Sequence, residues 1–213
     1  MTLQASGASG LRTDARDDVA TKERIVRSTV LALRRHAFHE LDFAALSLES
    51  GLPVGVLHQH FPAWSDVLIA VLDRWTSERL RPVSSPSGPI TAADYLRGMV
   101  ISNLHDPVLV HLLLTVAAST STVPKDPLAV YIRTRTDFFR SRVTDAVIAD
   151  IERGDEPASL DAAVAADQLL LLFDGLQIQW MMRPEMDVVG TFDRAVAELR
   201  YAWRHSGGTA AIS

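Results

Sequence analysis

Histidine is the side chain best suited to metal binding or proton transfer near neutral pH, and this 213-residue chain has seven histidines. His36 and His39 lie three residues apart, but a predicted helix ends between them. His58 and His60 lie two residues apart, which places them on different faces of a helix. No neighbouring carboxylate or thiol completes a metal site beside either pair. We therefore expect no bound metal.

Motifs for catalysis are also missing from the sequence. No Ser-His-Asp set, phosphate-binding glycine loop or pair of carboxylates stands in a plausible frame. The chain has no cysteine, which excludes disulfides and thiol catalysis and is compatible with a reducing cytosol. We therefore expect a cytoplasmic protein that is not an enzyme and needs no cofactor.

The net charge is −5, so the chain as a whole attracts neither nucleic acid nor an anionic membrane, and phosphate binding requires a local patch. Apolar residues make up 47% of the chain, which is long enough to bury a real core. The longest apolar stretch, residues 162–182, is a poor membrane span because polar side chains interrupt it: Asp167, Gln168, Asp174, Gln177 and Gln179. We expect no membrane partner.

Apolar residues recur at helical spacing without convincing strand alternation, so we predict an all-α fold of about nine helices. Four helix starts are marked by aspartate, two of them with a following proline: Asp106-Pro107, Asp126-Pro127, Asp161 and Asp187. Residues 81–89, with three prolines, three serines and one glycine, form the only convincing internal linker. We therefore expect four parts: a disordered arm (residues 1–18), an N-terminal module (19–80), a helical body (90–205) and a disordered tail (206–213).

One stretch of the N-terminal module predicts a helix-turn-helix. Asp42 can cap a first short helix. Gly51 follows where a tight turn between helices needs a positive φ, which glycine adopts at little cost. A second short helix, residues 54–61, presents Leu57 and Phe61 to the core. With a helix before it and a helix after it, such a pair is a DNA-reading arrangement.

The stretch of about residues 22–72 resembles the TetR family of transcriptional regulators. The likeness runs without a gap through Glu23-Arg24-Ile25, Phe38, Leu46, Gly51-Leu52, Gly55, Leu57, His60-Phe61-Pro62 and Ala70-Val71-Leu72. A weaker likeness, to the penultimate helix of many members, covers residues 174–180. The resemblance implies a transcriptional regulator, most simply a repressor, that binds operator DNA as a homodimer and is released by an apolar small molecule.

The resemblance also implies that the second short helix and its surroundings contact DNA. On this surface only Gly55 and His60 keep the residues of the family's pattern, and Trp64 replaces a lysine that typically meets a phosphate. The residues expected to contact DNA are Val54, Gly55, Val56, His58, Gln59, His60, Trp64, Lys22 and Arg24.

No Lys or Arg occurs between His36 and Asp73, a stretch that contains the whole helix-turn-helix. Since cations that displace counterions supply most non-specific DNA affinity, two interpretations stay open. In the first, the protein is a working regulator with an apolar reading surface, helped by cations of the first helix or by Arg12 and Arg16 of the arm. In the second, it has kept a TetR-like fold, lost DNA binding and acts as a small-molecule or protein-binding module.

Residues 162–182 are apolar nearly all round, so both sides of this predicted helix must be covered. The resemblance implies that this helix and the last one, residues 188–205, pair with their copies in a second subunit as a four-helix bundle. A two-fold dimer with reading helices about one DNA turn apart matches a palindromic operator. The residues expected at the dimer interface are Ala166, Gly175, Phe192, Val196, Leu199 and Trp203.

The three remaining helices of the body enclose the ligand pocket that the resemblance implies. Its expected wall is Met99, Asn103, Leu113, Thr115, Phe138, Phe139, Asp174, Gln177 and Met181. Met and Phe at helical spacing are more simply explained as residues that fill the core than as residues of a pocket wall. Asn103, Asp174 and Gln177 are sharper candidates, because buried polar atoms need partners. Those partners can be a ligand, one another or the second subunit.

Overall fold

The structure, a computed structural model, describes residues 7–79, 89–120 and 125–205. Over these residues it contains nine α-helices, one short 3-10 helix and no strand, which confirms the predicted all-α class. The sequence assigns residues 1–6, 81–88 and 206–213 to an arm, a linker and a tail, and these lie outside the described residues.

The chain divides into two compact units. The first comprises Met1–Glu78 and Asp126–Leu128, and the second comprises Arg79–Lys125 and Ala129–Ser213. Each unit has its own set of helices and its own buried side chains.

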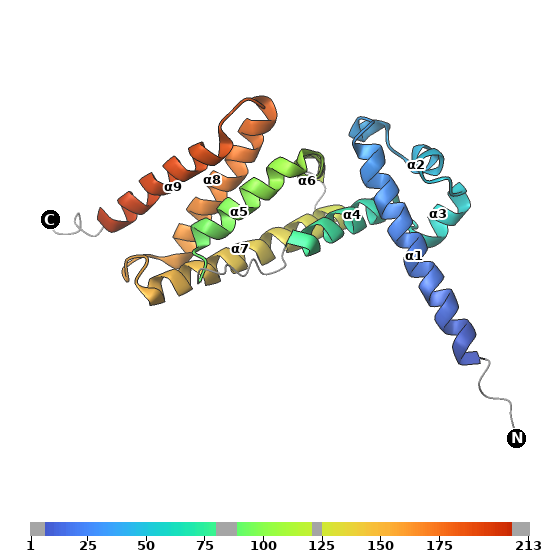
Figure 1. The fold of residues 1–213 in the computed structure, drawn as a ribbon, viewed down its shortest axis with the longest axis horizontal. Helices are drawn as coiled ribbons and strands as arrows, with labels where there is room; N and C mark the ends of the chain where they lie inside the picture. Colours follow the sequence, from blue (N-terminus) through green and yellow to red (C-terminus); the bar gives the residue numbers. More distant parts are fainter. Residues whose placement is uncertain (1–6, 80–88, 121–124, 206–213) are drawn as a thin grey trace, which may run out of the picture. The chain divides into compact units, whose positions relative to one another are not determined.

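The described part of the first unit contains α1 (Gly7–Leu33), the 3-10 helix η1 (Phe38–Glu40), α2 (Phe43–Ser50), α3 (Val54–His60) and α4 (Trp64–Arg79) (Figure 1). The N-terminal turns of α1 extend beyond α2 and α3 (Figure 1). Helix α1 starts at Gly7, within the stretch that we predicted to be a disordered arm, residues 1–18. Within α1, Lys22 forms an ion pair with Asp18 one turn away at 2.9 Å, which supports the helix at that point.

The turn between α2 and α3 forms as the sequence predicts. Asp42 Oδ1 accepts a hydrogen bond from the Ala45 N–H at 2.8 Å, which caps α2. Gly51 ends α2 in the left-handed region, with φ 66°, where a side chain would be strained. The Ser47 hydroxyl donates to the Leu52 carbonyl at 2.7 Å, which connects the turn to the helix before it.

One core joins the four α-helices of the first unit. Ile25, Leu46, Leu57 and Leu72, from α1, α2, α3 and α4 in that order, are fully buried. Each contributes roughly 1.5–3 kcal/mol to stability by leaving water. Because Leu57 faces the core, as predicted, the opposite face of α3 is directed outward.

The described part of the second unit contains α5 (Ala92–His105), α6 (Pro107–Thr120), α7 (Pro127–Arg153), α8 (Ala162–Met182) and α9 (Val188–His205). All four starts predicted from aspartate are confirmed. Helices α6 and α7 begin at Pro107 and Pro127, each directly after an aspartate. Asp161 Oδ1 accepts a hydrogen bond from the Ala163 N–H at 2.9 Å, and Asp187 caps α9 with a similar bond.

The core of the second unit lies between α5, α7, α8 and α9. Leu96, Val143, Leu169 and Phe192, one from each of these helices, are buried there. Helix α8 packs against α9, and α5 packs against both, as can be followed in Figure 1. No single helix in the described parts of the chain is long and apolar enough to cross a membrane.

Candidate functional site

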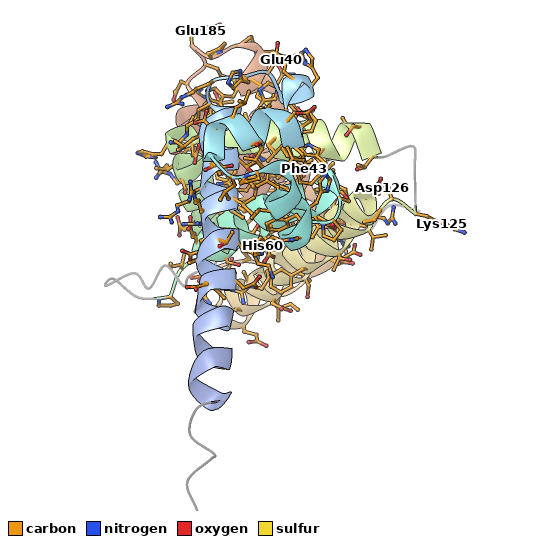
Figure 2. The ribbon with its side chains drawn as sticks, turned by 90° about the vertical axis from the view of Figure 1, so that its right-hand side faces the viewer. Glu40, Phe43, His60, Lys125, Asp126 and Glu185 are labelled. Atoms are coloured by element: carbon orange, nitrogen blue, oxygen red, sulfur yellow. The ribbon has the colours of Figure 1, made fainter. Side chains whose placement is uncertain are left out.

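Figure 2 looks onto α2 and α3, whose outer surface carries most of the residues predicted to contact DNA. Gly55, His58 and Gln59 are exposed, Val54 is 39% exposed and Val56 is half-buried. A Cβ placed on Gly55 would meet nothing within 4 Å, so the space above this backbone is open. Helix α3 contains no Lys, Arg, Asp or Glu. Its outward face is therefore accessible and largely uncharged.

Three rings form a cluster at the edge of α3. The ring centroid of Phe43, the first residue of α2 (Figure 2), lies 4.1 Å from that of His58 and 5.6 Å from that of Trp64. Trp64 is the first residue of α4 and meets Phe43 edge-on, a favourable geometry for two aromatic rings. The cluster therefore links α2, α3 and α4. Both His58 and Trp64 contribute to the packing of the unit as well as to its surface.

His60, labelled in Figure 2 at the end of α3, pairs with a carboxylate of α1. Its Nδ1 lies 2.8 Å from Asp18 Oδ1, and its side chain is only 15% exposed. Asp18 also pairs with Lys22 at 2.9 Å. The hydrogen bond from Lys22 lowers the pKa of Asp18, and His60 adds a smaller effect in the same direction. One carboxylate thus binds two of the groups that we predicted to contact DNA.

Arg24, another predicted DNA contact, stabilises the turn from α1. Its Nη2 donates a hydrogen bond to the Ser50 carbonyl at 2.6 Å, and the same nitrogen would lie 3.4 Å from a Cβ placed on Gly51. Arg35 of the segment after α1 pairs with Glu49 of α2 at 2.8 Å. Arg24 therefore holds α1 against the α2–α3 turn, a role that the sequence pattern did not reveal.

The charge of the first unit is negative. Residues 17–78 carry six Lys or Arg and nine Asp or Glu, a net charge of −3 with histidine neutral. Three of the six cations, Lys22, Arg24 and Arg35, are engaged in the ion pairs and the hydrogen bond described above. This stretch therefore offers little electrostatic attraction for the phosphates of DNA.

In the second unit, three of the predicted ligand-binding residues form a chain of hydrogen bonds. The Asn103 amide donates to Gln177 Oε1 at 2.5 Å, and the Gln177 amide donates to Asp174 Oδ1 at 3.3 Å. Asn103 and Gln177 are buried. Burial raises the pKa of Asp174, against an opposing effect of Arg135. The sequence left open which partners these three side chains have. The structure shows that they form hydrogen bonds with one another.

The other predicted wall residues differ in their surroundings. Met99 and Phe139 pack against the core of the second unit, where the ring centroids of Phe139 and Phe173 lie 5.9 Å apart. Phe138 is 50% exposed, which places it away from the core that Phe139 joins. The remaining three are half-buried: Leu113, Thr115 and Met181.

Most of the residues predicted at the dimer interface contact the core of their own unit. Five of the six residues pack into it: Ala166, Phe192, Val196, Leu199 and Trp203. Trp203 also donates a hydrogen bond from Nε1 to Gln168 of α8 at 2.6 Å. The apolar stripe of α9 therefore faces its own α5 and α8, and only Gly175 of the predicted set is exposed.

Helix α8 has a second apolar face that is directed outward. This α8 stripe consists of residues that recur at helical spacing: Val164, Leu171, Gly175, Ile178 and Met182. Leu171 and Met182 are 74% and 75% exposed. A row of large apolar side chains on a surface is typical of an interaction site.

No protein-family model and no curated protein sequence matches the chain. Solved structures do match it. A TetR transcription regulator from Haloarcula marismortui is 20% identical, with a TM-score of 0.74 over 87% of this chain and 98% of its own. MexZ, a repressor from Pseudomonas aeruginosa, is 19% identical, with a TM-score of 0.65 over 85% of this chain and 95% of its own. FadR from Bacillus subtilis, solved in complex with stearoyl-CoA, is 14% identical, with a TM-score of 0.64 over 84% of this chain and 97% of its own.

These likenesses show that the chain has the fold of TetR-family transcriptional regulators, as the sequence resemblance predicted. The matches extend over nearly the full length of each neighbour, so they include both units of the chain. The neighbours are regulators rather than enzymes, which gives indirect support to the expectation that this protein is not an enzyme.

Arg24→Gln should destabilise the protein by about 1.5 kcal/mol, because the Ser50 carbonyl loses a charged hydrogen-bond donor. Arg27→Gln is the matched control, since it removes the same charge from an exposed position on α1, and it should change stability by less than about 0.5 kcal/mol. Thermal and urea unfolding measure both variants. Equal losses would show that the Arg24 hydrogen bond does not stabilise the turn.

Proposed function

We propose that this protein is a ligand-responsive transcriptional regulator that acts as a repressor in the cytoplasm. A homodimer would bind palindromic operator DNA, and an apolar small molecule would release it. The observation that carries the proposal is the complete helix-turn-helix, with a capped α2, a left-handed Gly51 and an open outer face on α3. The fold that the chain shares with known regulators supports it.

The outward face of α3 would enter the major groove of DNA. Gly55 allows the backbone to approach the duplex, and Val54 and Val56 offer apolar contacts to thymine methyl groups. Gln59, which is exposed on the same helix, can form paired hydrogen bonds with adenine. DNA reading would then rest on shape, methyl contacts and a few hydrogen bonds, with a small contribution from cations.

The homodimer would form through the α8 stripe. A two-fold interface uses the same patch on each subunit, so an apolar face of this kind can be covered by its own copy. Leu171 and Met182, the most exposed members of the stripe, would lose the most contact with water. A two-fold axis at this interface would pair two α3 helices for the two halves of a palindrome.

The effector would bind in the second unit, beside the polar residues of α5 and α8. The FadR neighbour was solved with stearoyl-CoA, so one protein of this fold binds a ligand with a long apolar chain. Binding would favour a dimer geometry in which the two reading helices no longer fit successive grooves. Such a ligand acts only through a difference in its affinity for the two geometries.

Selection of genomic DNA fragments by the purified protein at low salt tests this function. We expect specific fragments to be retained. The slope of log K against log salt should be shallower than about −4, because each neutralised phosphate changes this slope by about −0.9 and α3 has no Lys or Arg to neutralise phosphates. A steep slope would show that cations outside the helix-turn-helix dominate binding. Failure to retain any fragment would overturn the proposal and favour a TetR-like module that binds small molecules or proteins only.

Val54→Lys combined with Gln59→Lys should strengthen binding at low salt and steepen the salt slope by about 2 for each subunit. Both positions are exposed on α3, so the new charges would meet phosphates or bases if α3 faces the duplex. The matched control carries Met at both positions, because Met has nearly the shape of Lys without its charge. If the Lys pair and the Met pair bind alike, α3 does not face DNA.

A further inference from the structure

The last residue of α3, His60, has two ring nitrogens in different environments. Nδ1 lies 2.8 Å from Asp18 Oδ1 of α1, and the histidine side chain is 15% exposed (Figure 2). Nε2 forms no hydrogen bond with any described residue, and it is not one of the buried polar atoms that lack a partner. Nε2 is therefore in contact with solvent and can bind a group from outside the chain.

Asp18 determines which nitrogen of His60 carries the hydrogen. The hydrogen bond from Lys22 lowers the pKa of Asp18, so this carboxyl group is ionised near neutral pH and only accepts hydrogen bonds. Nδ1 must therefore donate. In the neutral ring Nε2 then has no hydrogen and accepts, whereas in the protonated ring Nε2 donates as well. One proton thus converts the outward nitrogen from an acceptor into a charged donor.

The groups that face His60 favour its charged form only in part. Helix α3 packs against α1 and α2. From α1, the Asp18 carboxylate attracts a proton to the ring, while Lys22 on the other oxygen of this carboxylate opposes a second positive charge nearby. On α2, Glu49 pairs with Arg35 instead. A further anion at Nε2 would therefore shift the balance toward the protonated ring.

His60 is better placed for this role than His58, the other histidine of α3. His58 is exposed and its ring lies against Phe43, but among the described residues it has no carboxylate partner. On α4, Asp66 accepts a hydrogen bond from the Ala63 N–H at 2.9 Å and so caps its own helix. Only His60 combines a carboxylate at one nitrogen with an accessible second nitrogen.

We propose that binding to DNA places a proton on His60, and that Asp18 positions the ring so that Nε2–H donates to a phosphate of the duplex. The proton would come from the solvent and return to it when DNA is released. The inference rests on the proposed function, because it explains how α3, which has no Lys or Arg, can form a charged contact with DNA. Hydrogen bonds between a cation and a phosphate are among the strong ones.

The proposal fixes the direction in which pH acts on DNA binding. Histidine changes its charge between about pH 5 and 8, whereas Asp18, with its lowered pKa, stays ionised over this range. Affinity should therefore be high near pH 6 and fall as the pH rises. A contact made by Lys or Arg would keep its charge over the same range.

Titration calorimetry in two buffers of different ionisation enthalpy measures the proton uptake directly. The probe is a DNA fragment retained in the genomic selection described above, titrated into the full-length protein at pH 7.5 in HEPES and in Tris. We expect an uptake of roughly half a proton or more per subunit, and binding about tenfold tighter at pH 6 than at pH 8. His60→Gln should abolish the uptake, and Asp18→Asn should reduce it and weaken binding at pH 6 several-fold.

His39→Gln is the matched control, because His39 is an exposed histidine outside α2 and α3, and it should leave proton uptake and affinity unchanged. Circular dichroism checks that each variant is folded. If His60→Gln does not fold, Asp18→Asn decides the matter, since the Asp18 side chain is 45% exposed.

The proposal is overturned if no proton is taken up, if Asp18→Asn or His60→Gln keeps the full uptake, or if His58→Gln removes it instead. A fragment that binds without proton uptake would overturn this inference and leave the proposed function intact. Failure to retain any fragment would overturn both.

Discussion

The left-handed turn at Gly51 is the constraint on which the first unit depends. A φ of 66° and a guanidinium nitrogen 3.4 Å from the position of a Cβ leave little room for a side chain at this residue. The turn sets the angle between α2 and α3, so that Leu46 and Leu57 are buried in one core. The opposite face of α3 then points outward. A single backbone conformation therefore accounts for the presentation of the candidate reading surface.

Charged groups around this turn stabilise the unit itself. Arg24 donates to the Ser50 carbonyl, and Lys22 and His60 share the Asp18 carboxylate. Helix α3 itself carries no Lys, Arg, Asp or Glu. A regulator with such a surface would have little of the sequence-independent affinity that cations provide. Its selectivity would depend on contacts with base edges and on the shape of the groove.

Local signals in the sequence were enough to predict much of the fold, whereas long-range contacts were not. The caps at Asp161 and Asp187 and the turn at Gly51 depend on a residue and its near neighbours, so they could be predicted and are confirmed. The stripe containing Phe192 predicts that a face of α9 is covered, but an amphipathic pattern does not tell whether the same chain or a second subunit covers it. The hydrogen bond from Arg24 to the Ser50 carbonyl joins residues that are 26 positions apart, so no local pattern predicts it.

In the function proposed above, the outer face of α3, which carries no Lys, Arg, Asp or Glu, reads DNA through apolar contacts. Uracil in place of single thymines of a selected operator removes only the methyl group that Val54 and Val56 would touch. We predict that binding weakens about fourfold at one or more thymine positions, which corresponds to one buried methyl group, and that Val54→Ala with Val56→Ala abolishes this difference. Equal affinity for the thymine and uracil operators at every position would contradict the claim.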